Sequence, residues 1–162
     1  MAKVIFLCGF IGSGKTTYAK KLAAELPAFR FTMDEWMIPL FGEHMEREVF
    51  DARKAVLYNL FQQSALSLLK LGTSVIFDCG LWQKAERLEV AQWAQAEGFE
   101  FELHYLDVSF EQCCDRAYSR NKQRGEHAYE MTPAMMEMFW QQFELPSEED
   151  VVWVTSKPLR LT

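Results

Sequence analysis

The stretch 9-GFIGSGKT-16, from Gly9 to Thr16, decides how the rest of the chain is interpreted. It fits the pattern G-x-x-x-x-G-K-[ST] at every position. An apolar run from Val4 to Cys8 precedes it, and a helical pattern from Lys15 to Leu26 follows it. A strand, a glycine-rich loop and a helix in this order predict a loop that binds the phosphates of a nucleoside triphosphate.

The physical basis is the conformational freedom of glycine, which lets the backbone N–H groups of the loop turn toward an anion. The helix that follows adds the positive end of its dipole. Lys15 supplies a positive charge for the β- and γ-phosphates, and the Thr16 hydroxyl suits Mg²⁺, a hard ion with few protein ligands. The residues predicted to bind the nucleotide here are Gly9, Gly12, Ser13, Gly14, Lys15, Thr16 and Thr17.

Length and composition indicate one globular domain. The chain has 162 residues, 49% of them apolar and 25% charged, which suits a protein with its own core. No run reaches the ~18 apolar residues of a membrane span, and the apolar N-terminal stretch is too short for a signal peptide. The net charge of −6 does not favour a polyanionic substrate. The cysteines lack metal-ligand spacing, so we expect a cytoplasmic chain with reduced thiols.

Strand and helix patterns alternate, which predicts an α/β fold with a parallel sheet flanked by helices. We expect residues 1–162 to form a single domain with five strands in the order 2-3-1-4-5 and the site at their carboxyl ends. A small helical lid is expected at about residues 116–135. The strands are predicted at Lys3–Cys8, Phe29–Met33, Thr73–Phe77, Phe99–Val108 and Val151–Thr155. The helices are predicted at Lys15–Leu26, Glu35–Phe41, Glu46–Leu71, Gln83–Glu97, after Ser109 to Gln123, and from Pro133.

Two carboxylates follow predicted strands. Asp34 comes just after the second strand, and transfer of a phosphoryl group to a hydroxyl needs such a group to orient the acceptor and take its proton. Glu35 is the substitute for this role, and an N-cap of the short helix is the structural alternative for Asp34. Asp78 closes an apolar strand, as in a Walker B motif. It is predicted to bind Mg²⁺ with Thr16, or alternatively to bond the acceptor.

Arg116, Arg120 and Arg124 are four residues apart, so they share one helix face. They precede a predicted loop, Gly125–Met131, and arginines on a lid can neutralise charge on a transferring phosphoryl group. A solvated helix face is the alternative. Trp36 and Trp82 are candidates for the wall of an acceptor pocket, although core packing is the alternative for each.

A GTPase switch is disfavoured. The segment Asn121-Lys122-Gln123-Arg124 begins like the guanine-reading motif N-K-x-D but lacks its Asp. Leu81 stands where the D-x-x-G motif after the third strand would need glycine.

Four segments together resemble a group of small P-loop kinases. They are residues 9–17, 32–36, 77–81 and 120–125. The group includes polynucleotide 5′-kinases, chloramphenicol phosphotransferases and zeta toxins. The resemblance implies a three-layer P-loop NTPase sandwich that uses ATP and Mg²⁺.

The resemblance also implies roles for single residues. Asp34 matches the group that activates the acceptor hydroxyl, and Arg124 and Arg120 match lid arginines at the transferring phosphoryl group. In polynucleotide kinases an Arg after the Asp holds the substrate's phosphate, whereas this chain has Met37 there. Met37 and Trp36 would make the region apolar, which favours a small, partly apolar hydroxyl compound over nucleic acid.

The sequence therefore predicts an ATP- and Mg²⁺-dependent kinase that transfers the γ-phosphate to a hydroxyl of a small molecule. Two alternatives stay open. One is a polynucleotide or nucleotide kinase, which performs the same reaction on another acceptor. The other is an ATP-binding regulatory module without an acceptor.

Overall fold

The computed structural model describes residues 1–123, 130–147 and 151–155. Its centre is a parallel sheet with the strand order β2-β3-β1-β4-β5. The strands are β1 (Lys3–Cys8), β2 (Ala28–Thr32), β3 (Ser74–Asp78), β4 (Glu100–Asp107) and β5 (Val152–Thr155). The predicted α/β class with a parallel sheet is confirmed.

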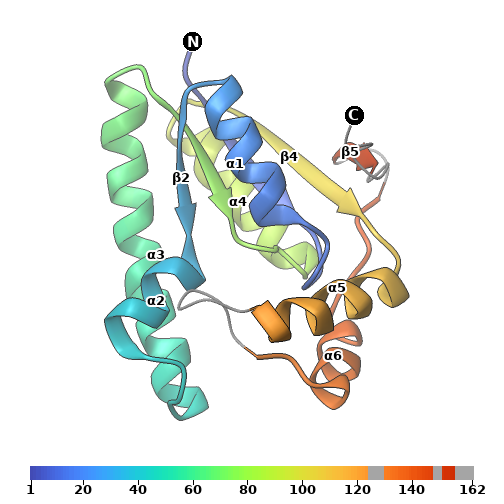
Figure 1. Cartoon of the computed structure of the whole chain (residues 1–162). Helices are drawn as coiled ribbons and strands as arrows, with labels where there is room; N and C mark the ends of the chain where they lie inside the picture. Colours follow the sequence, from blue (N-terminus) through green and yellow to red (C-terminus); the bar gives the residue numbers. More distant parts are fainter. Residues whose placement is uncertain (124–129, 148–150, 156–162) are drawn as a thin grey trace.

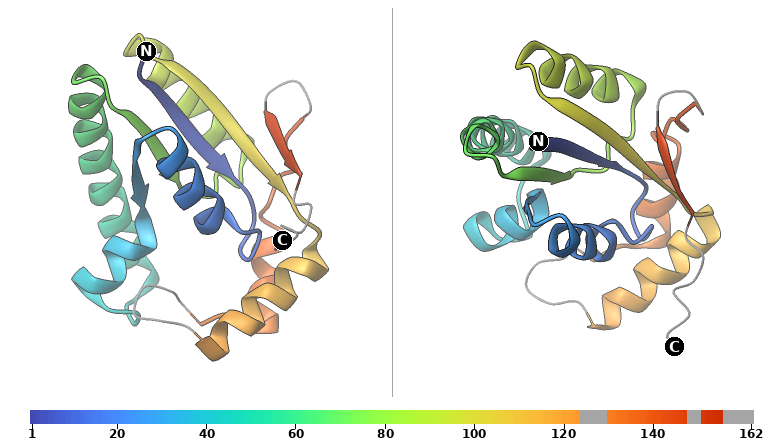
Figure 2. Two further views of the ribbon diagram at one scale, coloured as in Figure 1. Left: turned by 45° about the horizontal axis from the view of Figure 1, so that its top comes forward. Right: turned by 90° about the horizontal axis from the view of Figure 1, so that it is seen from above.

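Helices cover both faces of the sheet and its carboxyl end (Figure 1). In the view from above in Figure 2, α1 lies on one face, and α3 and α4 lie on the other. The helices α2, α5 and α6 lie at the edge where the strands end (Figure 1). The helix bounds are α1 (Lys15–Glu25), α2 (Met33–Phe41), α3 (Arg47–Lys70), α4 (Lys84–Ala96), α5 (Phe110–Gln123) and α6 (Pro133–Trp140).

The central strand β1 explains this layering. Val4 and Phe6 point into the core under α3 and α4, whereas Ile5 and Leu7 point into the core under α1. All four side chains are fully buried. A strand that is covered on both faces must be apolar at every position, which is why Val4–Cys8 is a continuous apolar run.

Polar side chains cap the N-terminal ends of α5 and α6. The Ser109 hydroxyl accepts the N–H of Gln112 before α5, at 3.2 Å. Thr132 accepts the N–H of Met135 before α6, at 3.3 Å, and proline follows it, as predicted. In contrast, α2 begins at Met33, so the interpretation of Asp34 as its N-cap is wrong.

None of the helices in the described residues combines the length and the apolar character that a membrane crossing needs.

Candidate nucleotide and acceptor site

The loop after β1 is held by the segment that follows β3. The N–H of Gly9 donates to the carbonyl of Gly80 at 3.0 Å. The indole Nε1 of Trp82 donates to the carbonyl of Gly9 at 3.3 Å. The loop is therefore fixed at its start by neighbours about seventy residues away, rather than by its own residues alone.

Gly12 brings the loop against α5. Its φ of +79° lies in the left-handed region, and a Cβ at this position would lie 2.3 Å from the carbonyl oxygen of Cys113. Gly14 also has a positive φ, of +92°. A side chain at position 12 would meet backbone that cannot move aside, so only glycine fits there.

The helix α5, which begins the region predicted to be a lid, bonds directly to the loop. Arg116 Nη1 donates to the carbonyl of Ser13 at 3.2 Å. Desolvation raises the pKa of the Asp34 carboxyl, and the charge of Arg120, one turn further on in α5, is close enough to oppose that increase. These two predicted arginines therefore lie at the site, whereas Arg124 lies outside the described residues.

Asn121 begins the segment that partly matches a base-reading motif, and its side chain is bonded to the backbone of Met131. Its Nδ2 donates to the carbonyl of Met131 at 2.6 Å, and its Oδ1 accepts the N–H of Met131 at 2.9 Å. Both ends of the amide are bonded to backbone. Asn121 thus joins the end of α5 to the chain before α6.

The loop is suited to an anion. The Ser13 hydroxyl is buried and has no hydrogen-bond partner in the described part of the chain. Lys15 Nζ donates to the carbonyl of Phe10 at 3.1 Å, which keeps its charge folded back over the loop. Thr17 follows on α1 and is exposed. An unpartnered donor and an ammonium group over one loop fit the oxygens of a phosphate chain.

Thr16 and Asp78 are suited to Mg²⁺. The Thr16 hydroxyl donates to Asp78 Oδ2 at 3.0 Å. Burial raises the pKa of Asp78, while Lys15, the Thr16 hydroxyl and Arg30 act in the opposite direction. No group of three or more His, Cys, Asp or Glu side chains that could hold a metal occurs among the described residues. A metal here would depend on phosphate oxygens and water for its other ligands, as Mg²⁺ commonly does.

Asp34 lies on the first turn of α2 and is accessible to solvent. The protein around it raises the pKa of its carboxyl by desolvation, and Lys15, Lys54 and Arg120 lower it. Its carboxylate makes no hydrogen bond with any described residue. Asp34 is thus an available carboxylate among positive charges from α1, α3 and α5.

Sequence reasoning missed two cations, Arg30 on β2 and Lys54 on α3. Arg30 forms an ion pair with Glu35 at 2.7 Å, so the Glu35 carboxylate is already occupied. The sequence feature that could have identified Arg30 is its position as a charged residue inside an otherwise largely apolar strand. Burial raises the pKa of Asp34 and of Cys79, directly after Asp78, and the positive charge of Lys54 opposes both increases. The long helical pattern gave no reason to place Lys54 at the site.

The prediction that Met37 makes the acceptor region apolar is wrong, because Met37 is fully buried in the core under α3. Trp36 is 43% exposed and its ring packs edge-on against Phe61. The Trp82 ring packs on Phe10 and Phe139, and its only polar atom is bonded to the loop. For Trp36 and Trp82 a contact with the acceptor stays a prediction.

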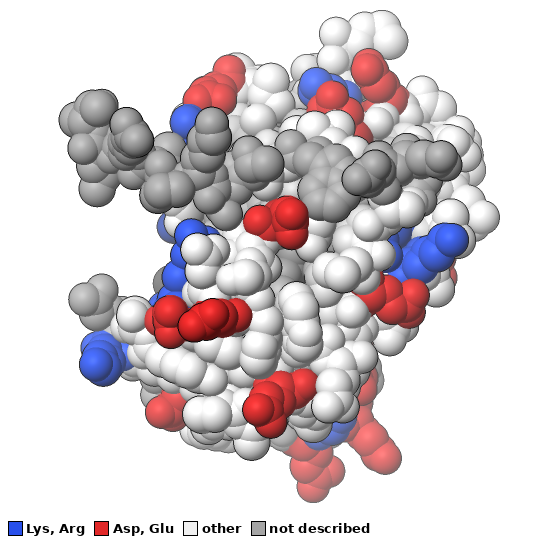
Figure 3. All heavy atoms as spheres, turned by 90° about the vertical axis from the view of Figure 1, so that its right-hand side faces the viewer, with Lys and Arg blue, Asp and Glu red and all other residues white. Residues whose placement is uncertain are grey.

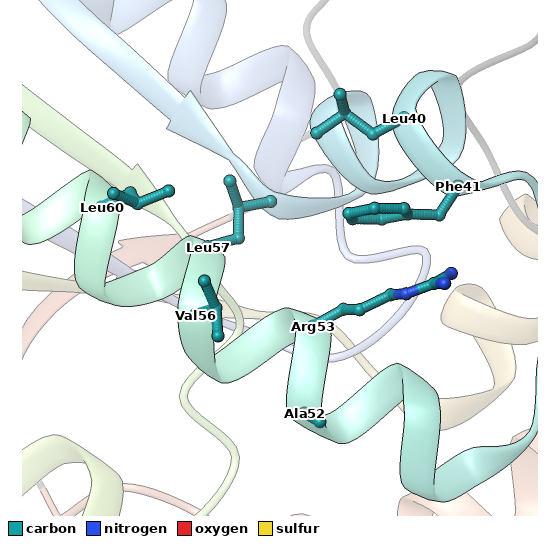
Figure 4. Close-up of a pocket in the computed structure, with 7 residues that line it drawn as sticks. All are labelled: Leu40, Phe41, Ala52, Arg53, Val56, Leu57 and Leu60. Atoms are coloured by element: carbon teal, nitrogen blue, oxygen red, sulfur yellow. The ribbon is translucent and has the colours of Figure 1, made fainter.

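A mainly apolar groove lies between α2 and α3. It has a volume of about 290 Å³ and is lined by residues that include Leu40, Phe41, Val56 and Leu60. Figure 4 shows the Arg53 side chain running toward the Phe41 ring, and its guanidinium lies 4.3 Å from the ring centre. The groove involves the last residues of α2, whereas Asp34 stands on the first turn of that helix.

A P-loop at the end of β1, the helix α5 bonded to it, and the aspartates directly after β2 and at the end of β3 are typical of a P-loop domain of the small-kinase type. The chain belongs to the family AAA_33, described as an AAA domain, which matches residues 4–146. The resemblance to small P-loop kinases is confirmed. No protein of curated function matches the sequence.

Solved structures share the fold. A Chloroflexus aurantiacus protein, provisionally classed as a kinase, has 20% identity and a TM-score of 0.73 over 95% of this chain and 88% of its own. A gluconokinase from Sinorhizobium meliloti has 15% identity and a TM-score of 0.63 over 94% and 82%. The APS kinase of Mycobacterium tuberculosis, solved with AMPPNP and APS, has 17% identity and a TM-score of 0.65 over 96% and 89%.

Proposed function

We propose that this protein is an ATP- and Mg²⁺-dependent phosphotransferase that acts on a hydroxyl group of a small, polar acceptor. The observation that carries the proposal is the position of Asp34. It lies within electrostatic range of the P-loop lysine, Lys15, and of Arg120 on the lid helix, and its carboxylate is bonded to no described residue. Phosphoryl transfer to a hydroxyl needs a carboxylate near the phosphates that can accept a proton, whereas nucleotide binding alone does not need one.

The other residues take roles that follow from their contacts. The N–H groups of the loop and Lys15 would hold the phosphates, and Thr16 and Asp78 would hold Mg²⁺, which when bound neutralises charge on the phosphates. Asp34 would orient the acceptor hydroxyl and take its proton. Arg116 and Arg120, with Arg124 as a further proposed lid residue, would neutralise charge on the phosphoryl group.

The polar character of the acceptor follows from the groups around Asp34. Met37 does not face the site, and Lys54 does stand near Asp34. The net charge of −6 still favours a small compound over nucleic acid. On the face in Figure 3, the described Lys, Arg, Asp and Glu side chains are scattered in small groups over a mainly uncharged surface, and no basic patch extends across it. Two neighbours in fold are named as a gluconokinase and an APS kinase.

The test is ADP release from MgATP with a panel of small hydroxyl compounds and oligonucleotides bearing a 5′-hydroxyl. The proposal expects one or more small polar compounds to accelerate ADP release and to gain a phosphate, detected by mass spectrometry. Phosphorylation of the oligonucleotides alone would establish the polynucleotide alternative. ATP binding with a conformational response, but with no phosphorylated product from the panel, would support a regulatory module.

A further inference from the structure

We propose that Arg30 is a positioning residue that holds the helix carrying Asp34 in a fixed relation to Asp78. The inference rests on the proposed function, because it takes Asp34 as the acceptor-side group and Asp78 as the metal-side group. Nothing in the P-loop motif or in the resemblance points to a residue four positions before Asp34.

The register of the sheet explains how Arg30 reaches the site. Arg30 pairs with Ile76 of β3, and Thr32 pairs with Asp78. Residues two apart on a strand share a face, so Arg30, Thr32 and Asp78 lie on the same face of the sheet. That face is covered by α1, which carries Thr16, and Ile76 belongs to the core beneath that helix. A long side chain at position 30 therefore runs along the strand toward its carboxyl end.

The guanidinium has partners on three elements. Nη1 donates to the Thr32 hydroxyl on β2, and Nη2 bonds Glu35 Oε2 on α2 at 2.7 Å. Nη1 also lies 4.0 Å from Asp78 Oδ2 on β3. The Arg30 side chain is 16% exposed and that of Asp78 is 3% exposed. Charges this far removed from water need partners, and the planar fork of arginine can serve several at fixed angles.

The consequence concerns Asp34, the residue before Glu35. The Asp34 carboxylate has no hydrogen bond in the described part of the chain, so its position depends on where α2 begins. The Arg30–Glu35 pair fixes that point against β2, and the approach of Arg30 to Asp78 fixes it against β3. The contact also makes Glu35 a structural partner of Arg30 rather than a substitute base for Asp34.

The experiment compares Arg30→Met with the wild type in two measurements. The first is the affinity for ATP with and without Mg²⁺. The ratio of these two affinities reports on the metal-side role proposed for Asp78 and does not require turnover. The second is the rate of ADP formation from MgATP at saturation. Glu35→Gln removes the link to α2 alone and serves as a milder variant if Arg30→Met does not fold. Arg47→Met is the matched control, because Arg47 pairs with Asp51 on the exposed surface of α3.

Removal of a residue that orients metal ligands typically lowers metal affinity or activity by about 10–100-fold. We expect Arg30→Met to reduce both the Mg²⁺-dependent gain in ATP affinity and the rate by that amount, with ATP affinity in the absence of Mg²⁺ retained. Glu35→Gln should lower the rate while leaving most of the gain from Mg²⁺. Arg30→Lys should restore part of that gain, because it keeps a positive charge near Asp78, but less of the rate, because it lacks the fork.

Wild-type values in Arg30→Met would overturn the proposal. Equal loss of ATP affinity with and without Mg²⁺ would also overturn it, since that result indicates general damage to the fold. If the wild type itself phosphorylates no acceptor, the proposed function fails, whereas the dependence of ATP affinity on Mg²⁺ still tests the link between Arg30 and Asp78.

Discussion

Gly12→Ala should disrupt nucleotide binding far more than a glycine substitution of equal backbone strain elsewhere. Gly12 has a φ of +79°, and a Cβ there would lie 2.3 Å from the Cys113 carbonyl oxygen. Gly98, after α4, has a φ of +78° and nothing within 4 Å of the same position. Gly98→Ala therefore measures the backbone penalty alone, and the difference between the two variants measures the contact with α5.

The size of each effect follows from the structure. A left-handed conformation costs an alanine about 1–2 kcal/mol. For a domain of this length that loss lowers Tm by about 2–8 °C. Ordinary contact begins at 3.4 Å, so in Gly12→Ala the loop and α5 must separate by about 1 Å. A shift of this size at a reacting centre lowers the rate by about 100-fold.

The assay combines thermal unfolding, titration with MgATP and the rate of ADP formation. Both variants should lose stability, Gly12→Ala more than Gly98→Ala, and only Gly12→Ala should lose affinity for MgATP and activity. Equal MgATP affinity in the two variants would refute the reasoning, because it would mean that the loop does not depend on its close approach to α5.

Three further substitutions test other parts of the site and the core. Lys15→Ala should weaken the binding of ATP itself, and unchanged affinity in a titration would contradict the assignment of the loop. Trp82→Phe removes the bond to the Gly9 carbonyl and should destabilise the protein by about 0.5–1.5 kcal/mol in denaturant unfolding; full stability would mean that this bond does not hold the loop. Burial lowers the pKa of His104 below its ordinary value of 6.5, although its bond to Glu102 acts against this. His104 therefore binds a proton more readily in the unfolded chain, so the free energy of unfolding should fall as the pH drops below 6.5. A His104→Gln variant with the same pH dependence of stability would contradict this role of His104.

The sequence was sufficient for the elements whose cause is local. The apolar run at Val4–Cys8 and the motif that follows it place β1, the loop and α1 because periodicity and glycine content act over a few residues. The caps at Ser109 and Thr132 set the starts of α5 and α6 for the same reason. Asp34, after β2, and Asp78, at the end of β3, lie at one edge of the sheet because the carboxyl ends of parallel strands share that edge.

Residues whose role depends on register or on helix rotation were not predictable in this way. Arg30 reaches Asp78 only because β2 pairs with β3 at one particular offset. Met37 occupies the position of a substrate-binding arginine in the motif, but α2 turns it into the core. Lys54 stands near Asp34 because of how α3 packs against the sheet. Sequence spacing carries no information about these long-range placements.

The central claim is that Asp34 accepts the proton of the acceptor hydroxyl during phosphoryl transfer, and Asp34→Asn tests it most directly. The measurement is the MgATP affinity and the rate of phosphoryl transfer to the best acceptor found, both compared with the wild type. We predict nearly unchanged affinity and a transfer rate lower by about 10²–10⁴-fold. A variant that transfers phosphate at the wild-type rate would contradict the assignment of Asp34 and leave the carboxylate without a catalytic role.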